Sequence, residues 1–273
     1  MSKKKVLIVT QEMEPYTALT QVSETVRQLA PHVQEKGMEI RVLMPRFGTI
    51  NERRHRLHEV VRLSGMNIIV DDDDYPLIIK VASLPEARMQ VYFLDNEDFF
   101  KRKFIFDDED EQPFADNEDR MVFFCKGVLE TVKKFGWPPD IIHCHGWMTS
   151  LIPLYLKTAY KNEPLFEQAK IVYSAYESKD YAASFSDDFV QKASINNLTE
   201  EDLHHYSKST EASLDLGVVE YVDAIIRGGE NLAAPLDEFL ANTDKPVMDY
   251  EAENHRGKVI EFYQSLLTEE VES

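Results

Sequence analysis

The residues best suited to ligand chemistry lie in one segment, Asp140–Pro153, where an apolar strand runs directly into a helix. His143 and His145 stand two residues apart, so on a strand both imidazole rings point to the same face. Trp147 follows at the strand-to-helix junction. In open α/β sheets, ligands bind outside the carboxyl ends of the strands. We therefore expect a sugar or nucleotide pocket at this junction.

A metal site at the junction lacks the ligands that it would need. Zinc takes four ligands in structural sites, and no Glu-x-x-His or Cys-x-x-Cys motif accompanies His143, Cys144 and His145. The acidic runs Asp71–Asp74 and Asp107–Glu111 do not have the ligand order of an EF-hand loop. We predict no metal and no cofactor, and we interpret the histidines as structural and the acidic runs as solvated loop tips.

Strands alternate with helices along most of the chain. Six short apolar segments are the expected strands of the main sheet: Val6–Val9, Glu39–Met44, Met89–Leu94, Ile141–His143, Lys170–Ser174 and Val222–Ile226. Leu57–Val70 and Tyr75–Ser83 partly alternate apolar and polar residues, as half-exposed strands do, and the acidic tip Asp71–Asp74 separates them. Helices are expected over Asn117–Phe135 and, at the end of the chain, over Pro246–Leu267.

This alternation predicts an α/β fold with a single Rossmann-like, doubly wound, mainly parallel sheet and a β-hairpin insertion. No internal repeat or low-complexity linker divides the 273 residues. We expect one domain over residues 1–245, followed by a C-terminal helix and acidic tail over residues 246–273.

The composition limits the partners and the compartment. The formal net charge is −19 and the isoelectric point is near 4.8, so the surface repels nucleic acid and anionic membranes. Cys125 and Cys144 both lie in apolar segments, which is ordinary in a reducing cytosol. No apolar stretch has the length of a signal core or a membrane span. We expect a cytoplasmic protein with no nucleic-acid or membrane partner.

Five segments stand in a family-like order and spacing: Glu12-x-x-Pro15, Arg41–Gly48, Val91–Asn96, Asp140–Trp147 and Leu151–Leu156. Together they resemble the N-terminal half of bacterial glycogen (starch) synthases, which are retaining glucosyltransferases with the two-domain GT-B fold. In that family the N-terminal domain holds the acceptor glucan, and the second domain binds most of ADP-glucose. The resemblance implies one half of a GT-B fold, because the residues after Ile226 are too few for a second Rossmann-like domain.

The resemblance also implies a degenerate donor loop. The family's Lys-x-Gly-Gly-Leu aligns with residues 18–22, so Ala18 replaces the lysine that holds the diphosphate, and Thr20 and Gln21 replace the glycines. The glycines let backbone N–H groups approach the phosphates at a helix N-terminus. Side chains at Thr20 and Gln21 are expected to enter that space.

Two further family motifs are altered. His-Asp-Trp-His becomes His145-Gly146-Trp147-Met148, with the loss of an acid and a base, and Tyr176 replaces a histidine that lies near the sugar. Tyrosine cannot replace that histidine as a cation at neutral pH. We interpret Gly228-Gly229 as a plain strand-to-helix turn, with an anion site at the helix N-terminus as the alternative.

Aromatic rings can stack on the apolar face of a sugar, and nearby polar groups can bind its hydroxyls. The candidates for a glucan or sugar cleft are Glu12, Tyr16, Asp95, Asn96, His145, Trp147 and Tyr176. Core packing is an equal alternative for Trp147. No residue is assigned a catalytic role.

Three functions stay open. The first is a catalytically inactive pseudoenzyme that binds α-glucan or a nucleotide sugar, or that regulates polysaccharide synthesis. The second is an active ADP-glucose-dependent glucosyltransferase, completed by a separate donor-domain chain or by a homodimer mate. The third is a pure protein-interaction module. Because half of a GT-B protein exposes a former interdomain face, we expect a homo-oligomer or a partner there.

Overall fold

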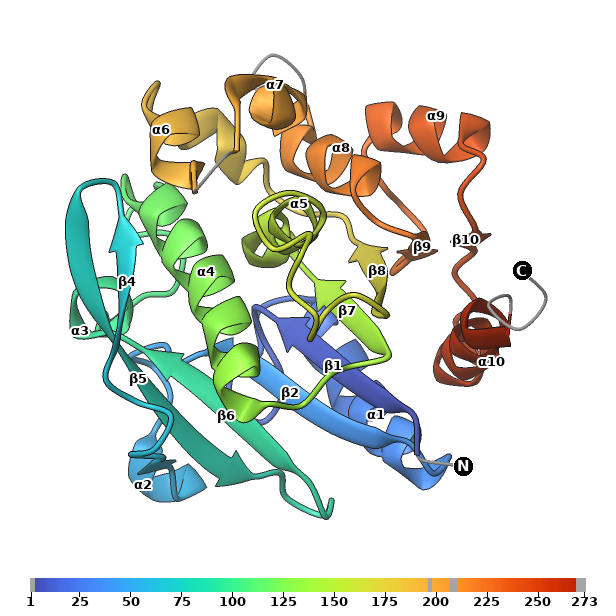
Figure 1. The fold of residues 1–273 in the computed structure, drawn as a ribbon, viewed down its shortest axis with the longest axis horizontal. Coiled ribbons are helices and arrows are strands. Elements are labelled where there is room, and N and C mark those ends of the chain that lie inside the picture. Colours follow the sequence, from blue (N-terminus) through green and yellow to red (C-terminus); the bar gives the residue numbers. More distant parts are fainter. Residues whose placement is uncertain (1–2, 196–197, 207–210, 269–273) are drawn as a thin grey trace.

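The structure, a computed structural model, describes residues 3–195, 198–206 and 211–268. Within these residues the sheet order is β10-β9-β8-β7-β1-β2-β6-β5-β3, with β4 paired to β5 outside this path (Figure 1). The strands are β1 (Lys5–Thr10), β2 (Glu39–Pro45), β3 (His58–Glu59), β4 (Met66–Val70), β5 (Asp73–Ser83), β6 (Gln90–Asp95), β7 (Ile141–His145), β8 (Lys170–Ala175), β9 (Ala224–Arg227) and β10 (Val247–Met248).

The sheet is doubly wound around β1. The chain passes from β1 to β2 on one side and later places β7 on the other side of β1. Neighbours from β10 to β6 pair in parallel, whereas β3, β4 and β6 each pair with β5 in an antiparallel manner. These pairings confirm the predicted α/β class, the mainly parallel sheet and the hairpin insertion.

Helices cover both faces of the sheet (Figure 1). They are α1 (Gln21–Glu35), α2 (Glu52–His55), α3 (Glu97–Phe100), α4 (Asn117–Phe135), α5 (Leu151–Lys157), α6 (Phe189–Ala193), α7 (Glu200–Leu203), α8 (Ser213–Glu220), α9 (Ala234–Asn242) and α10 (His255–Thr268). Helix α10 packs against α1, while α4 packs against α5. No helix in the described part of the chain is long and apolar enough to cross a membrane.

Two predicted elements are corrected. Leu57–Val70 is not one strand, because the chain turns after Val60 and Gly65 takes a positive φ of 80°, which separates β3 from β4. Pro246–Leu267 is not one helix, because Val247 and Met248 pair with Ile225 and Ile226 as an edge strand, and α10 begins only at His255. Residues 269–273, the end of the expected acidic tail, lie outside the described residues.

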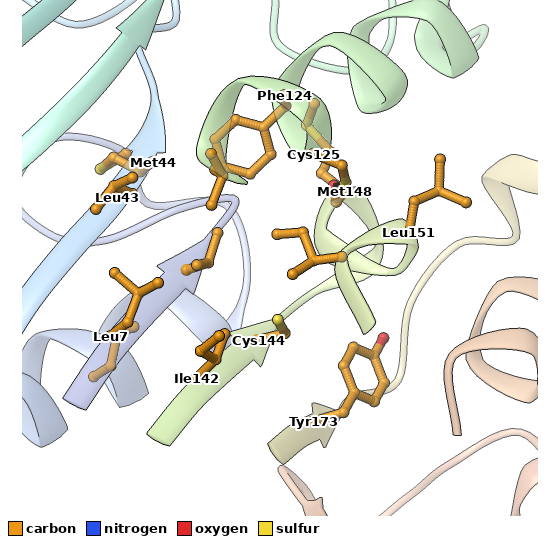
Figure 2. Close-up of a cluster of buried hydrophobic side chains, with 14 of the residues drawn as sticks. Leu7, Leu43, Met44, Phe124, Cys125, Ile142, Cys144, Met148, Leu151 and Tyr173 are labelled. Carbon is orange, nitrogen blue, oxygen red and sulfur yellow. Dashed lines mark hydrogen bonds between the residues drawn. The ribbon is translucent and has the colours of Figure 1, made fainter. Parts of the chain in front are cut away.

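The core beside α4 draws its side chains from the central strands (Figure 2). These side chains are no more than 1% exposed, and they include Leu7, Leu43, Ile142, Cys144 and Tyr173, with Phe124, Cys125, Met148 and Leu151 from the covering segments. Because side chains alternate along a strand, the residues on either side of Cys144 on β7 face the opposite layer. Those neighbours are His143 and His145.

Candidate functional site

The carboxyl ends of β1, β7, β8 and β9 lie side by side in the sheet, and each strand leads into a loop that carries candidate residues (Figure 1). Beyond them lies a recess of about 380 Å³, which we call the α1–β9 recess. Its lining residues are Thr20, Gln21, Tyr176, Glu177, Gly229, Glu230, Asn231 and Tyr250. This set holds two carboxylates, and among the described residues no lysine or arginine belongs to it.

Glu12 holds the loop that precedes α1. Its side chain is fully buried, and its carboxylate accepts hydrogen bonds from the backbone N–H of Leu19 at 2.8 Å and of Thr20 at 2.9 Å. The Thr20 hydroxyl donates to the same carboxylate at 2.6 Å and accepts from Val22 N–H as the N-cap of α1. The N–H groups of Leu19 and Thr20 are therefore already bound to an internal anion, while Ala18 is exposed in the same loop.

Gln21 bridges the start of α1 to the loop after β9. Its side-chain amide donates to the Gly228 carbonyl at 3.1 Å and to the Tyr250 hydroxyl at 3.2 Å. A Cβ atom added at Gly229 would lie 3.1 Å from the Gln21 side-chain oxygen. The Gln21 side chain thus stands in the recess between the two loops.

Tyr176 fills the space between β7 and the loop after β9. Its hydroxyl lies 2.8 Å from His145 Nδ1, and a Cβ atom at Gly228 would come within 2.4 Å of its ring. Only a residue without a side chain fits at Gly228. Burial and, to a lesser extent, the nearby His255 lower the pKa of His145 to about 3, so this imidazole is neutral at physiological pH. His145 Nε2 has no hydrogen-bond partner among the described residues.

The two histidines of β7 lie with their ring centroids 3.8 Å apart, which confirms that they share one face. His143 Nδ1 lies 2.5 Å from the Tyr263 hydroxyl, and His143 Nε2 lies 2.7 Å from the Ser174 hydroxyl. Burial lowers the pKa of His143 well below its usual value. Hydroxyl groups therefore occupy both nitrogens of His143, in keeping with a structural role.

Trp147 is only 3% exposed. Its ring stacks on Tyr181 at a centroid distance of 4.7 Å and meets Phe106 edge-on at 5.0 Å. Its indole N–H finds no acceptor in the described part of the chain. The neighbouring rings cover much of the indole surface that a sugar would need.

The structure does not bring Tyr16, Asp95 and Asn96 to the recess. Tyr16 is packed edge-on against Phe93 and His55. Asp95 lies 2.8 Å from Lys80 Nζ, and Asn96 caps α3 by accepting from the N–H groups that follow it. These three side chains hold β6 and its neighbours together. Of the expected aromatic and imidazole groups, only Tyr176 lines the recess, and His145 lies behind it at hydrogen-bond distance from the Tyr176 hydroxyl.

Sequence reasoning missed Glu177, Glu230 and Tyr250 as lining residues. Glu177 and Glu230 come shortly after β8 and β9, and the rule that ligands meet strand ends could have found them. Tyr250 carried no such signal, because its segment had the pattern of a helix.

The comparisons with known proteins place the chain in a family. Residues 5–233 match the family described as "Starch synthase catalytic domain", and the chain belongs to that family. The glycogen synthase of Pelodictyon phaeoclathratiforme is 40% identical over 173 residues, which are 63% of this chain and 35% of that protein. The glycogen synthase of Chlorobium phaeobacteroides is 41% identical over 169 residues, which are 62% and 35%. The matched part is thus about a third of the length of these relatives.

A solved structure shows the same fold. The catalytic domain of starch synthase IV from Arabidopsis thaliana, bound to ADP and acarbose, matches with a TM-score of 0.66 at 18% identity. The match covers 82% of this chain and 45% of that one. The expected resemblance to part of a GT-B glycogen synthase is therefore confirmed.

Proposed function

We propose that this member of the starch synthase catalytic domain family does not transfer glucosyl groups by itself. The observation that carries the proposal is the α1–β9 recess, which we relate to the donor diphosphate through the resemblance of residues 18–22 to the family's Lys-x-Gly-Gly-Leu loop. Its charged side chains are Glu177 and Glu230, and both repel an anion. Glucosyl transfer needs preorganised positive charge or donors at the leaving diphosphate, typically worth several kcal/mol.

The loop before α1 supports the same proposal. Backbone N–H groups at a helix N-terminus are a common phosphate site, but here Glu12 accepts from the N–H groups of both Leu19 and Thr20. A phosphate would have to displace a fully buried carboxylate, which would then lose both backbone N–H donors.

Glucosyl transfer from radiolabelled ADP-glucose to glycogen tests the proposal directly. The purified chain is assayed beside the full-length Pelodictyon glycogen synthase, and ADP binding is measured by calorimetry. We expect transfer at least about a thousandfold below the control, because several kcal/mol of stabilisation are lost. Transfer by the chain alone would refute the proposal, and transfer only after addition of a separate donor domain would favour the two-chain enzyme.

α-Glucan binding is expected to be weak. Tyr16, Trp147 and Tyr176 are each less than a tenth exposed, so none offers an open ring face for stacking. Titration of maltoheptaose into the ¹⁵N-labelled chain, followed by NMR, should give a dissociation constant no tighter than about 1 mM. Saturable binding of maltoheptaose with a micromolar dissociation constant would instead support a glucan-binding role.

A further inference from the structure

A second hollow, of about 610 Å³, is lined by Trp147 and shares Thr20 with the α1–β9 recess. We call it the Trp147 groove, and its apolar wall comprises Leu19, Phe104, Ile105, Phe106, Trp147 and Tyr181. Only four large hydrophobic side chains are substantially exposed among the described residues, and two of them, Leu19 at 48% and Phe104 at 38%, line this groove. Exposed apolar side chains gathered in one hollow are typical of interaction sites.

The rim of the Trp147 groove is acidic. Asp107, Asp108, Glu109 and Glu111 line it together with two lysines, so the lining carries four acids against two bases. Lys179 is engaged internally, because its ammonium donates to Asp107 at 2.7 Å and to the Glu111 carbonyl at 3.0 Å. Glu109 and Glu111 are exposed at the rim. The groove therefore presents apolar anchors beside accessible negative charge.

The negative charge of the rim favours some possible ligands of the apolar groove over others. A second copy of the chain carries the same net charge of −19 and the same acidic rim, so two such grooves facing one another would repel. A nucleotide or another phosphate ligand would be repelled for the same reason. A segment that combines apolar side chains with lysine or arginine complements both the wall and the rim.

We propose that the Trp147 groove binds an apolar segment of another protein that carries lysine or arginine beside its apolar anchors. The anchors pack on Leu19 and Phe104, and the cationic groups pair with Glu109 and Glu111. The groove shares Thr20 with the α1–β9 recess, but the proposal requires neither donor binding nor glucosyl transfer.

Fluorescence anisotropy with a labelled amphipathic peptide tests the groove on the full chain. The probe is a leucine- and lysine-containing helix of about 15 residues with leucine at i, i+3, i+4 and i+7. Two peptides of equal length serve as comparisons, one with serine for each leucine and one with glutamate for each lysine. We expect saturable binding of the probe, weakened by added NaCl, and at least about tenfold weaker binding of both comparison peptides.

Matched chain variants locate the binding. Leu19→Ser and Phe104→Ser should each weaken the binding of the probe by at least about tenfold. Val61→Ser and Ile69→Ser remove the two other exposed hydrophobic side chains, at 78% and 57% exposure, and should leave binding unchanged within about twofold. All four positions are on the surface, and circular dichroism verifies folding. The Glu109→Gln, Glu111→Gln double variant should bind the probe more weakly than the parent chain, and its affinity should depend less on the concentration of NaCl.

Three results would overturn the proposal. One is the absence of probe binding to the parent chain up to about 1 mM. Another is equal loss of binding in Leu19→Ser and Val61→Ser, which would mean non-specific attraction. The third is a dimer mass in light scattering that Leu19→Ser and Phe104→Ser abolish, because the occupant would then be a second copy.

Discussion

Tyr263 on α10 places its hydroxyl 2.5 Å from Nδ1 of His143 on β7, a residue 120 positions earlier in the chain. Both side chains are fully buried. The other His143 nitrogen lies 2.7 Å from the Ser174 hydroxyl on β8. The C-terminal helix is thereby joined to the central strands through a buried polar pair, in addition to its packing on α1.

Removal of this hydroxyl should destabilise the fold. Tyr263→Phe keeps the ring but leaves His143 Nδ1 buried without its partner, and an unpaired buried polar group costs about 1–3 kcal/mol. Urea unfolding should show that loss in the free energy of unfolding. Tyr250→Phe is the matched control, because its hydroxyl accepts a hydrogen bond in an exposed setting, and it should change stability by less than about 0.5 kcal/mol. Equal effects would contradict a special role for the His143 contact.

Asp215 on α8 gives the stability a defined pH dependence. It accepts a hydrogen bond from Tyr173 at 2.7 Å, and burial raises its pKa to about 6. Between about pH 4 and pH 6 the folded protein binds more protons here than the unfolded chain, so raising the pH removes stability. The side chain in Asp215→Asn stays neutral, so the free energy of unfolding of this variant, relative to that of the parent, should rise by about 2 kcal/mol from pH 4 to pH 7.5.

A second aspartate should show the opposite sign. The backbone N–H and side chain of Thr199 lower the pKa of Asp202, so its folded form holds the carboxylate more readily than the unfolded chain does. Asp202→Asn should therefore lose stability relative to the parent as the pH rises through the acidic range. Urea unfolding at several pH values compares both variants. Curves for Asp215→Asn and Asp202→Asn that shift in the same direction would refute the burial-based interpretation of Asp215.

The two glycines after β9 should differ sharply in their tolerance of a methyl group. A Cβ at Gly228 would come within 2.4 Å of the packed Tyr176 ring, whereas at Gly229 the nearest atom is the side-chain oxygen of Gln21 at 3.1 Å. Because Gln21 can rotate and Tyr176 is buried, Gly228→Ala should cost about 1–3 kcal/mol and Gly229→Ala less than about 1 kcal/mol. Thermal unfolding distinguishes them, and a double variant Gly228→Ala, Tyr176→Phe should not recover stability, because the ring remains.

The alternation of strands and helices was sufficient to predict the sheet, and the spacing of His143 and His145 was sufficient to predict a shared face. Local sequence could not assign Tyr16, because the rings that enclose it, His55 and Phe93, come from distant segments. The same holds for Tyr250: its contact with Gln21 depends on the edge strand β10 rather than on any local pattern. Long-range packing, not local periodicity, determines which of the expected site residues lie at the recess.

The charge of the α1–β9 recess predicts a gain of nucleotide affinity by redesign. Ala18→Lys, Thr20→Gly and Gln21→Gly restore a cation and open the loop, and Glu177→Gln with Glu230→Gln removes the two carboxylates that line the recess. A variant that carries all five substitutions should bind ADP at least about tenfold more tightly than the parent in calorimetry, a change of about 1.4 kcal/mol. The loop changes alone should gain less, because both carboxylates still repel the diphosphate.

Net charge must be controlled in this comparison. Glu35 and Glu86 are exposed and do not line the recess, so Glu35→Gln with Glu86→Gln removes the same two charges elsewhere. Added to the loop variant, this pair should raise ADP affinity by less than about twofold, because solvent and salt screen exposed charges that do not line the recess, with a screening length of about 8 Å at physiological ionic strength. If the remote pair matched the recess pair, long-range attraction would explain the gain. The carboxylates of Glu177 and Glu230 would then not be what keeps a nucleotide out of the recess.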